Sequence, residues 1–120
     1  MSKEPDNTPE VEYEDQQMIN RFGRLNDQVS TLKKQQAGFK QDLENYEDAS
    51  DEIMLSDDDK VKFLIAGSFI EIPQEEAEER LNKLKEKVED SLQKVEKELA
   101  DYSKELTELK VKLKSKFGDS

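Results

Sequence analysis

An apolar residue recurs at every seventh position through most of the first half of this 120-residue chain, and this repeat constrains the fold more than any other feature. A second series, interrupted by polar residues, runs three positions before the first. Two such positions per seven residues are typical of a helix that packs along another helix. We therefore predict a helix over residues 12–55. The two series are Met18, Leu25, Leu32, Phe39, Tyr46 and Ile53, and Phe22, Val29, Gln36, Leu43 and Ser50.

The same repeat returns after Pro73 and predicts a second helix over residues 74–117. Its companion series changes phase once near Leu92, as a stutter in a coiled coil would do. Glutamates crowd the start of this helix and lysines its end, which complements the helix dipole. The two series are Leu81, Val88, Val95, Tyr102 and Leu109, and Leu92, Leu99, Leu106 and Leu113, with Ala77 and Leu84 before the phase change.

Between the helices the period of the pattern changes from seven to two over residues 60–72. Val61, Phe63 and Ile65 alternate with other residues, "AGS" allows a turn, and a second alternating run ends at Pro73. This pattern is typical of a β-hairpin. Because a hairpin reverses the chain, we expect the helices to pair antiparallel. The expected pairs are Ile53 with Leu81, Tyr46 with Val88, and Phe39 with Val95.

These elements predict a mainly α fold, a long antiparallel two-helix coiled coil joined by one β-hairpin. We expect a single domain over residues 12–117, preceded by a flexible tail over residues 1–11 and followed by a short end over residues 118–120. Pro5 and Pro9 among polar residues favour the tail. Thr8 before Pro9 is also a suitable helix cap, since Pro fits the first helical position.

Composition excludes several classes of function. Charged residues make up 41% of the chain and the formal net charge is −11, so we predict no nucleic-acid or membrane partner and favour basic or unfolded proteins as partners. The chain has no Cys and no His, which removes the usual nucleophile–base pairs. We therefore predict no enzymatic activity, no catalytic residue and no cofactor. The absence of a long apolar run and of a signal-peptide pattern predicts a cytoplasmic protein.

The acidic run "SDDDK" at residues 56–60 suggests a metal site, because clustered carboxylates bind hard cations. Its spacing argues against one. A calcium loop needs oxygen ligands at alternate positions, a Gly at the sixth and a Glu at the twelfth, whereas Asp57 is followed by Val61, Lys62 and Phe63. We predict a solvated turn from helix to strand and no bound metal.

The hairpin needs a partner surface, because an isolated two-stranded sheet is marginally stable in water. Two interpretations are open. The hairpin packs on its own coiled coil, or hairpins from several chains join edge to edge into a closed barrel. We favour assembly and name as subunit-assembly residues Val61, Phe63, Leu64, Ile65, Phe69, Ile70 and Ile72.

Apolar residues outside the two seams gather where the first helix begins and the second ends. Tyr13, Ile19, Val111 and Phe117 are such residues, and the expected pairing places them together at one tip. They tighten fraying helix ends, or they leave the tip partly apolar for transient contact with another protein.

Three stretches give the chain a resemblance to a known family. "EDQQMINRF" at residues 14–22, "DDDKVKFLIAGSFIEIPQEEAEERL" through the hairpin and "LKVKLKSKFG" at residues 109–118 resemble prefoldin in its β-type subunits. The resemblance covers nearly the whole chain beyond residue 11. The order of helix, single hairpin and helix is similar to the β-type, whereas α-type subunits have two hairpins.

The resemblance implies a heterohexamer of two α-type and four β-type subunits, so that this chain would join two α-type and three further β-type partners. In such a complex the hairpins form a platform. The coiled-coil tips capture unfolded actin and tubulin and deliver them to the cytosolic chaperonin without ATP. For this sequence the resemblance implies that the client-binding tip consists of Met18, Ile19, Phe22, Val111, Leu113 and Phe117. An alternative from another class is a structural coiled-coil tether or spacer subunit, which needs its hairpin to dock but needs no apolar tip.

Overall fold

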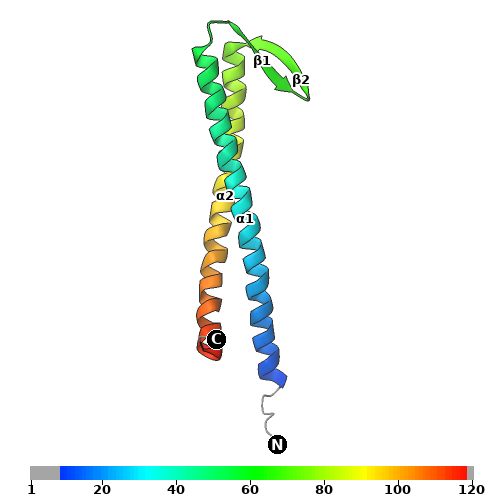
Figure 1. The fold of residues 1–120 in the computed structure, drawn as a ribbon, viewed down its shortest axis with the longest axis vertical. Helices are drawn as coiled ribbons and strands as arrows, with labels where there is room; N and C mark the ends of the chain where they lie inside the picture. Colours follow the sequence, from blue (N-terminus) through cyan, green and yellow to red (C-terminus); the bar gives the residue numbers. More distant parts are fainter. Residues whose placement is uncertain (1–8, 119–120) are drawn as a thin grey trace, which may run out of the picture. The chain divides into compact units, whose positions relative to one another are not determined.

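The structure, a computed structural model, describes residues 9–118 and consists of two long helices with a hairpin between them in sequence (Figure 1). Its elements are α1 (Pro9–Leu55), β1 (Lys60–Ile65), β2 (Ser68–Pro73) and α2 (Gln74–Phe117). This order confirms the predicted fold class. None of the described helices has an apolar stretch long enough to cross a membrane.

Helix α1 begins at Pro9, three residues before the predicted start. Pro lacks a backbone N–H, and the first turn of a helix needs none there, so its fixed φ favours a helix start. Residues 9–11, which were predicted to belong to the tail, are therefore helical. Residues 1–8 and 119–120 lie outside the described residues, and with them the suggested cap Thr8 and most of the predicted C-terminal end.

The chain divides into two compact units, and each helix contributes to both. The first unit is the described part of Met1–Lys34 with that of Glu96–Ser120, and the second unit is Gln35–Val95, which contains the hairpin. The single domain predicted for residues 12–117 stays a prediction.

In the first unit, α1 and α2 bury the apolar residues of the predicted seams. Leu25 is fully buried, and the other apolar seam residues of this unit are buried or half-buried. The off-seam positions of both helices carry mostly charged and amide side chains. The seven-residue repeat therefore identified the contact between the helices correctly. The buried residues of the unit are Leu25, Val29, Leu32, Leu99 and Leu109.

In the second unit, the core lies where the hairpin packs on both helices. Ile53, Ile72, Ala77 and Leu81 form a buried cluster. The predicted neighbours Ile53 and Leu81 thus share one core. Partly buried residues from both helices and from β1 pack against it, namely Tyr46, Ala49, Val61, Phe63 and Leu84.

The hairpin is antiparallel, and its register places the predicted faces correctly. Phe63 pairs with Ile70 and Leu64 with Phe69. Because side chains alternate along a strand, Val61, Phe63 and Ile72 share the face that packs on the cluster, while Leu64 and Phe69 share the opposite face.

A two-residue turn connects the strands. Ala66 has a φ of 49° and Gly67 a φ of 81°, so both residues lie in the left-handed region. Tight hairpins need this backbone because it matches the twist of the strands. Gly67 adopts it without steric strain because it has no Cβ. Ala66 adopts it with some strain, because its Cβ lies close to the following carbonyl oxygen.

Leu25→Ala should lower the free energy of unfolding of the full chain by about 2 to 5 kcal/mol, because it leaves a cavity at a fully buried position. Urea denaturation followed by helical circular dichroism measures the change. Val111→Ala is the control, since Val111 is 62% exposed in the same unit, and it should change stability by less than about 0.5 kcal/mol. Equal losses in the two variants would contradict the burial of the seam.

Candidate functional site

The first candidate surface is the tip of the first unit, which we define as residues 13–25 of α1 with residues 105–117 of α2. Here the N-terminal part of α1 lies beside the C-terminal part of α2. The Nζ of Lys116 and the Oδ1 of Asp15 form an ion pair between the helices. Close to the ends of both helices, this pair fixes their register.

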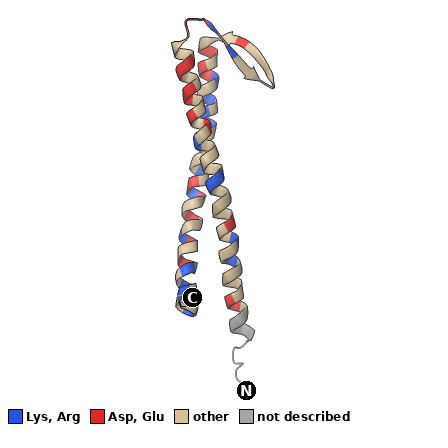
Figure 2. Ribbon diagram, viewed as in Figure 1, with Lys and Arg blue, Asp and Glu red and all other residues tan. Residues whose placement is uncertain are grey.

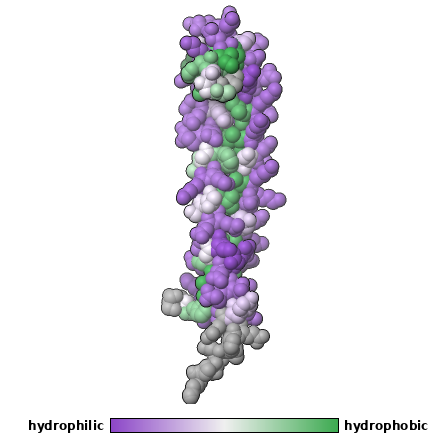
Figure 3. Space-filling view, turned by 90° about the vertical axis from the view of Figure 1, so that its right-hand side faces the viewer, coloured by the Kyte–Doolittle hydropathy of each residue, from purple (hydrophilic) through white to green (hydrophobic). Residues whose placement is uncertain are grey.

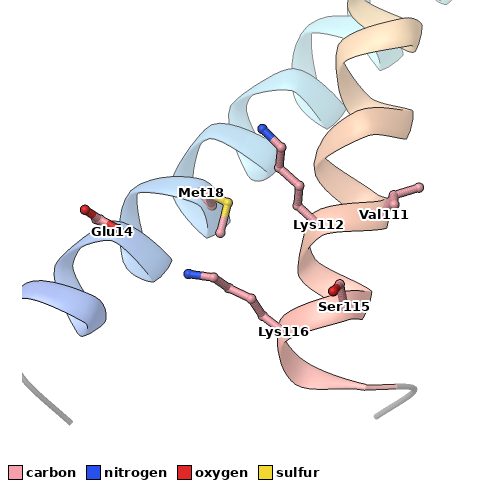
Figure 4. A pocket seen from close by; sticks show the side chains of 6 residues that line it. All are labelled: Glu14, Met18, Val111, Lys112, Ser115 and Lys116. Atoms are coloured by element: carbon pink, nitrogen blue, oxygen red, sulfur yellow. The ribbon is translucent and has the colours of Figure 1, made fainter.

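The tip contains an open cavity of about 480 Å³ between the helices (Figure 4). Met18 extends into it from α1, and Lys112 and Lys116 extend towards α1 from α2. The cavity therefore combines an apolar thioether with two cationic rim groups. Its lining is completed by Glu14, Val111 and Ser115.

The structure brings only two of the six predicted tip residues, Met18 and Val111, into this cavity. Phe22 and Leu113 are half-buried seam residues. Ile19 and Phe117 are about half exposed at 46% and 47%. Ile19, Val111 and Phe117, which were expected to leave the tip partly apolar, are therefore exposed. Their role in binding stays a prediction.

Arg21 and Glu105 form a bidentate ion pair across the helices of the tip. The Nε of Arg21 donates to Oε2 of Glu105 at 2.8 Å, and Nη2 donates to Oε1 at 2.9 Å. The hydrogen bonds and the charge of Arg21 hold the pKa of Glu105 below its usual range, and Glu105 in turn raises the pKa of Arg21. Both side chains are more than a third exposed, so solvent screens the pair and its main effect is on register.

The last turns of α2 make the tip locally basic although the chain as a whole is acidic. Lys110, Lys112, Lys114 and Lys116 follow one another at alternate positions, and Figure 2 shows this cluster at the end of α2. Sequence reasoning attributed these lysines to the helix dipole. It missed that two of them line a cavity, because that depends on how α1 passes beside α2.

The second candidate surface is the hairpin, one face of which, its inner face, packs on the helices of its own chain. Val61 and Phe63 are half-buried and Ile72 is buried against the chain's own helices. All three residues were also predicted to take part in subunit assembly, and that role stays a prediction. The small Ala77 lies in the cluster onto which the inner face packs.

Apolar side chains on both faces of the hairpin remain exposed, since Ile70 shares the face of its partner Phe63. Phe69 is 72% exposed, and Leu64 and Ile70 are also exposed, which leaves a hydrophobic surface on the hairpin (Figure 3). The side chain of Ile65 lies outside the described residues. Exposed apolar groups of this size are typical of an interface. The assembly role of these residues stays a prediction.

Sequence reasoning missed Met54 and Leu55, which are exposed at the end of α1. They follow the last seam residue, Ile53, at positions that cannot face the partner helix. Their positions off the seam could have indicated from the sequence that both side chains are exposed. The described residues contain no group of three or more acidic, Cys or His side chains placed to hold a metal ion.

The fold and these two surfaces define a class of protein, a helical coiled-coil subunit with apolar groups exposed on a hairpin and at a tip. Residues 16–120 match the family model described as "Prefoldin subunit", and the chain belongs to this family. The predicted resemblance is thereby confirmed.

Individual relatives give the same result. The chain is 37% identical over 112 residues to "Prefoldin subunit 4" of Homo sapiens, covering 92% of this chain and 84% of the human one. It is 37% identical to "Probable prefoldin subunit 4" of Dictyostelium discoideum, covering 92% and 85% of the two chains. It is 30% identical to "Prefoldin subunit 4" of Saccharomyces cerevisiae, covering 95% and 89%.

The Arg21–Glu105 pair predicts a pH-dependent difference in stability between the wild type and Glu105→Gln. The lowered pKa of Glu105 means that its contribution is fully present above the usual carboxylate pKa and is lost as pH falls through the lowered value. Wild type should unfold at a higher temperature than the variant near neutral pH, and this difference should vanish in acid. Melting curves over a pH series measure it.

Added salt should also shrink the difference at neutral pH, because the pair is exposed to screening. A difference that is the same at every pH and salt concentration would contradict an ionic contribution. Glu108→Gln is the control, since Glu108 is exposed and forms no ion pair among the described residues.

Proposed function

We propose that this chain is one subunit of a heterohexameric prefoldin complex, with two α-type and three further β-type subunits as partners. The complex acts in the cytoplasm as a co-chaperone that needs no ATP. It binds unfolded proteins such as actin and tubulin and delivers them to the cytosolic chaperonin. Membership of the prefoldin subunit family supports this proposal.

The observation that carries the proposal is the tip cavity with exposed apolar side chains on both of its helices. Ile19 on α1 and Val111 and Phe117 on α2 are exposed in the same unit that contains the cavity. A folded partner would need a complementary fixed surface. An unfolded segment can instead place single apolar side chains against whichever of these groups it meets.

Weak contacts of this kind suit a protein that must release what it binds. Each partly buried apolar side chain contributes about 1 to 2 kcal/mol, which a few contacts cannot turn into tight binding. Several tips held in one complex raise the effective concentration of the next contact. Avidity then retains the unfolded chain, and stepwise release remains fast.

The exposed part of the hairpin supports assembly through this element. Leu64, Phe69 and Ile70 lose contact with water only if another chain covers them. The inner face of the hairpin already packs on the helices, so the sheet is held in place before assembly. A fixed sheet pays less conformational entropy on binding than a mobile one.

Phe69→Asp with Ile70→Asp should abolish hexamer formation and leave the helix content of the chain nearly unchanged, because two charges would be buried at the intersubunit sheet. Light scattering of the co-expressed complex gives its mass, and circular dichroism gives the helix content. Asn82→Asp with Gln93→Asp adds the same charge at exposed positions of α2 and should assemble normally. An intact hexamer in the first variant would contradict the role of the hairpin.

Ile19→Ser, Val111→Ser and Phe117→Ser combined should leave assembly intact and weaken the protection of denatured actin from aggregation. None of the three is a seam residue, and the tips of the other subunits remain, so the loss should be partial. Light scattering of diluted, denatured actin with equal amounts of each hexamer measures protection.

A matched control places three Ser residues at exposed positions away from the tip, one on α1 and two on α2. It combines Gln35→Ser, Gln93→Ser and Ala100→Ser and should protect as well as wild type. Equal protection by the tip variant across several unfolded proteins would favour the structural tether instead.

A further inference from the structure

A groove of about 310 Å³ lies between β1 and α2 in the second unit. Its apolar lining comes from Phe63, Leu64 and Leu84, and its basic lining from three residues of α2. Leu64 is 58% exposed, so the apolar part is open to solvent. The basic residues are Arg80, Lys83 and Lys87.

The basic groups of the groove are available to a partner. Arg80 lies 3.5 Å from Glu76 and Lys83 lies 3.6 Å from Glu79, both as pairs one helical turn apart on α2. Exposed pairs of this length are weak and exchange readily. Lys87 has no ion pair with any residue that the structure describes. The groove therefore offers an apolar floor with a positive rim, in which Lys87 has no ion pair among the described residues and Arg80 and Lys83 are weakly paired.

The same unit carries a segment of the opposite character, residues 54–59. Met54 is 69% exposed and Leu55 is 83% exposed. Three exposed carboxylates follow them at residues 57–59. The segment thus presents apolar groups and then negative charges, and neither apolar side chain is covered by its own chain.

Hydrogen bonds from backbone and side-chain groups brace this segment. The backbone N–H of Gln74 donates to the carbonyl of Asp59 at 2.8 Å, and Nε2 of Gln74 donates to the carbonyl of Ile53 at 2.6 Å. The N–H of Asp58 donates to Oγ of Ser56 at 3.2 Å. A segment fixed in this way with its side chains outward loses little entropy when it binds.

We infer that the groove between β1 and α2 binds the helix-to-strand segment of a neighbouring subunit, one that has the apolar and then acidic chemistry of residues 54–59 here. This inference rests on the proposed membership of a multisubunit complex. The contact joins two different surfaces of similar units, so it is head-to-tail and can close a ring. Apolar contacts supply most of the affinity.

The charges decide which segment fits. Subunits as acidic as this chain, at −11, repel one another at a distance. A basic rim at the point of contact offsets that repulsion locally and rejects a basic or neutral segment. The contact is therefore additional to pairing of hairpin edges, and it sets which subunit lies beside this one.

Zero-length cross-linking of the co-expressed complex tests the inference. A carbodiimide joins a lysine Nζ to a carboxylate only when the two are in contact. We expect Lys83 and Lys87 to be joined to carboxylates that follow the first helix of a neighbouring subunit, as identified by mass spectrometry. Links from these lysines only to other parts of the neighbours, or none between subunits, would overturn the inference.

Lys83→Glu with Lys87→Glu should remove these links and destabilise the complex most at low salt, where the repulsion that the glutamates introduce is least screened. The control, Lys94→Glu with Lys97→Glu, makes the same charge change at exposed positions farther along α2 and should behave as wild type. Lys83→Gln with Lys87→Gln should show an intermediate effect without adding repulsion.

The outcomes separate this inference from the proposed function. Failure of the wild-type chain to enter any complex would contradict the proposed function and the inference together. If the wild-type chain enters a complex and both groove variants form complexes as stable as wild type at every salt concentration, only the inference is overturned. Circular dichroism of each isolated chain checks that the variants fold, and a groove variant that folds, assembles and links as wild type also overturns it.

Discussion

Burial of a narrow apolar seam between two helices is the contact on which the rest of this molecule depends. Only 32% of the residues are hydrophobic, and the seam uses most of the large ones. Leu25 in one unit and Leu81 in the other are buried because each faces the partner helix. A two-helix contact has no second layer, so an apolar residue off the seam has no place inside the chain. Such residues must stay exposed or meet another molecule.

The hairpin cluster is the exception, and it shows what an additional layer needs. Ala77 is fully buried beside Ile72, where its small side chain fits among three larger ones. Gln74 donates hydrogen bonds to the carbonyls of Ile53, in α1, and Asp59, just before β1. These bonds hold the end of α1 and the start of β1 together. The hairpin is thus part of the core on one face and an exposed surface on the other. Contacts within the chain therefore fix the position of the sheet.

Periodicity predicted the parts of the fold that follow from residue spacing along the chain, and it failed for features that depend on how separate elements pack together. Helix seams and hairpin faces follow from spacings of seven and two, so positions such as Leu32 and Phe69 were placed correctly. The inward packing of Val61 and Phe63 depends on the direction in which the hairpin leaves α1, which no spacing encodes. The tip cavity was missed for the same reason. Lys112 and Lys116 lie one turn apart on α2, but the cavity that they line also needs Met18, which is far away in sequence on α1.

Local charge matters more here than the net charge from which a preference for basic partners was predicted. At physiological ionic strength a charge is screened beyond about 8 Å, so a bound segment is influenced by the groups around its site and little by the rest of the chain. Both apolar cavities with a basic rim, at Met18 and at Leu64, carry lysines from α2. Acidic residues elsewhere give the chain its net charge of −11, which opposes the close approach of two copies. The net charge of the chain therefore does not decide which charge would be favoured at either cavity.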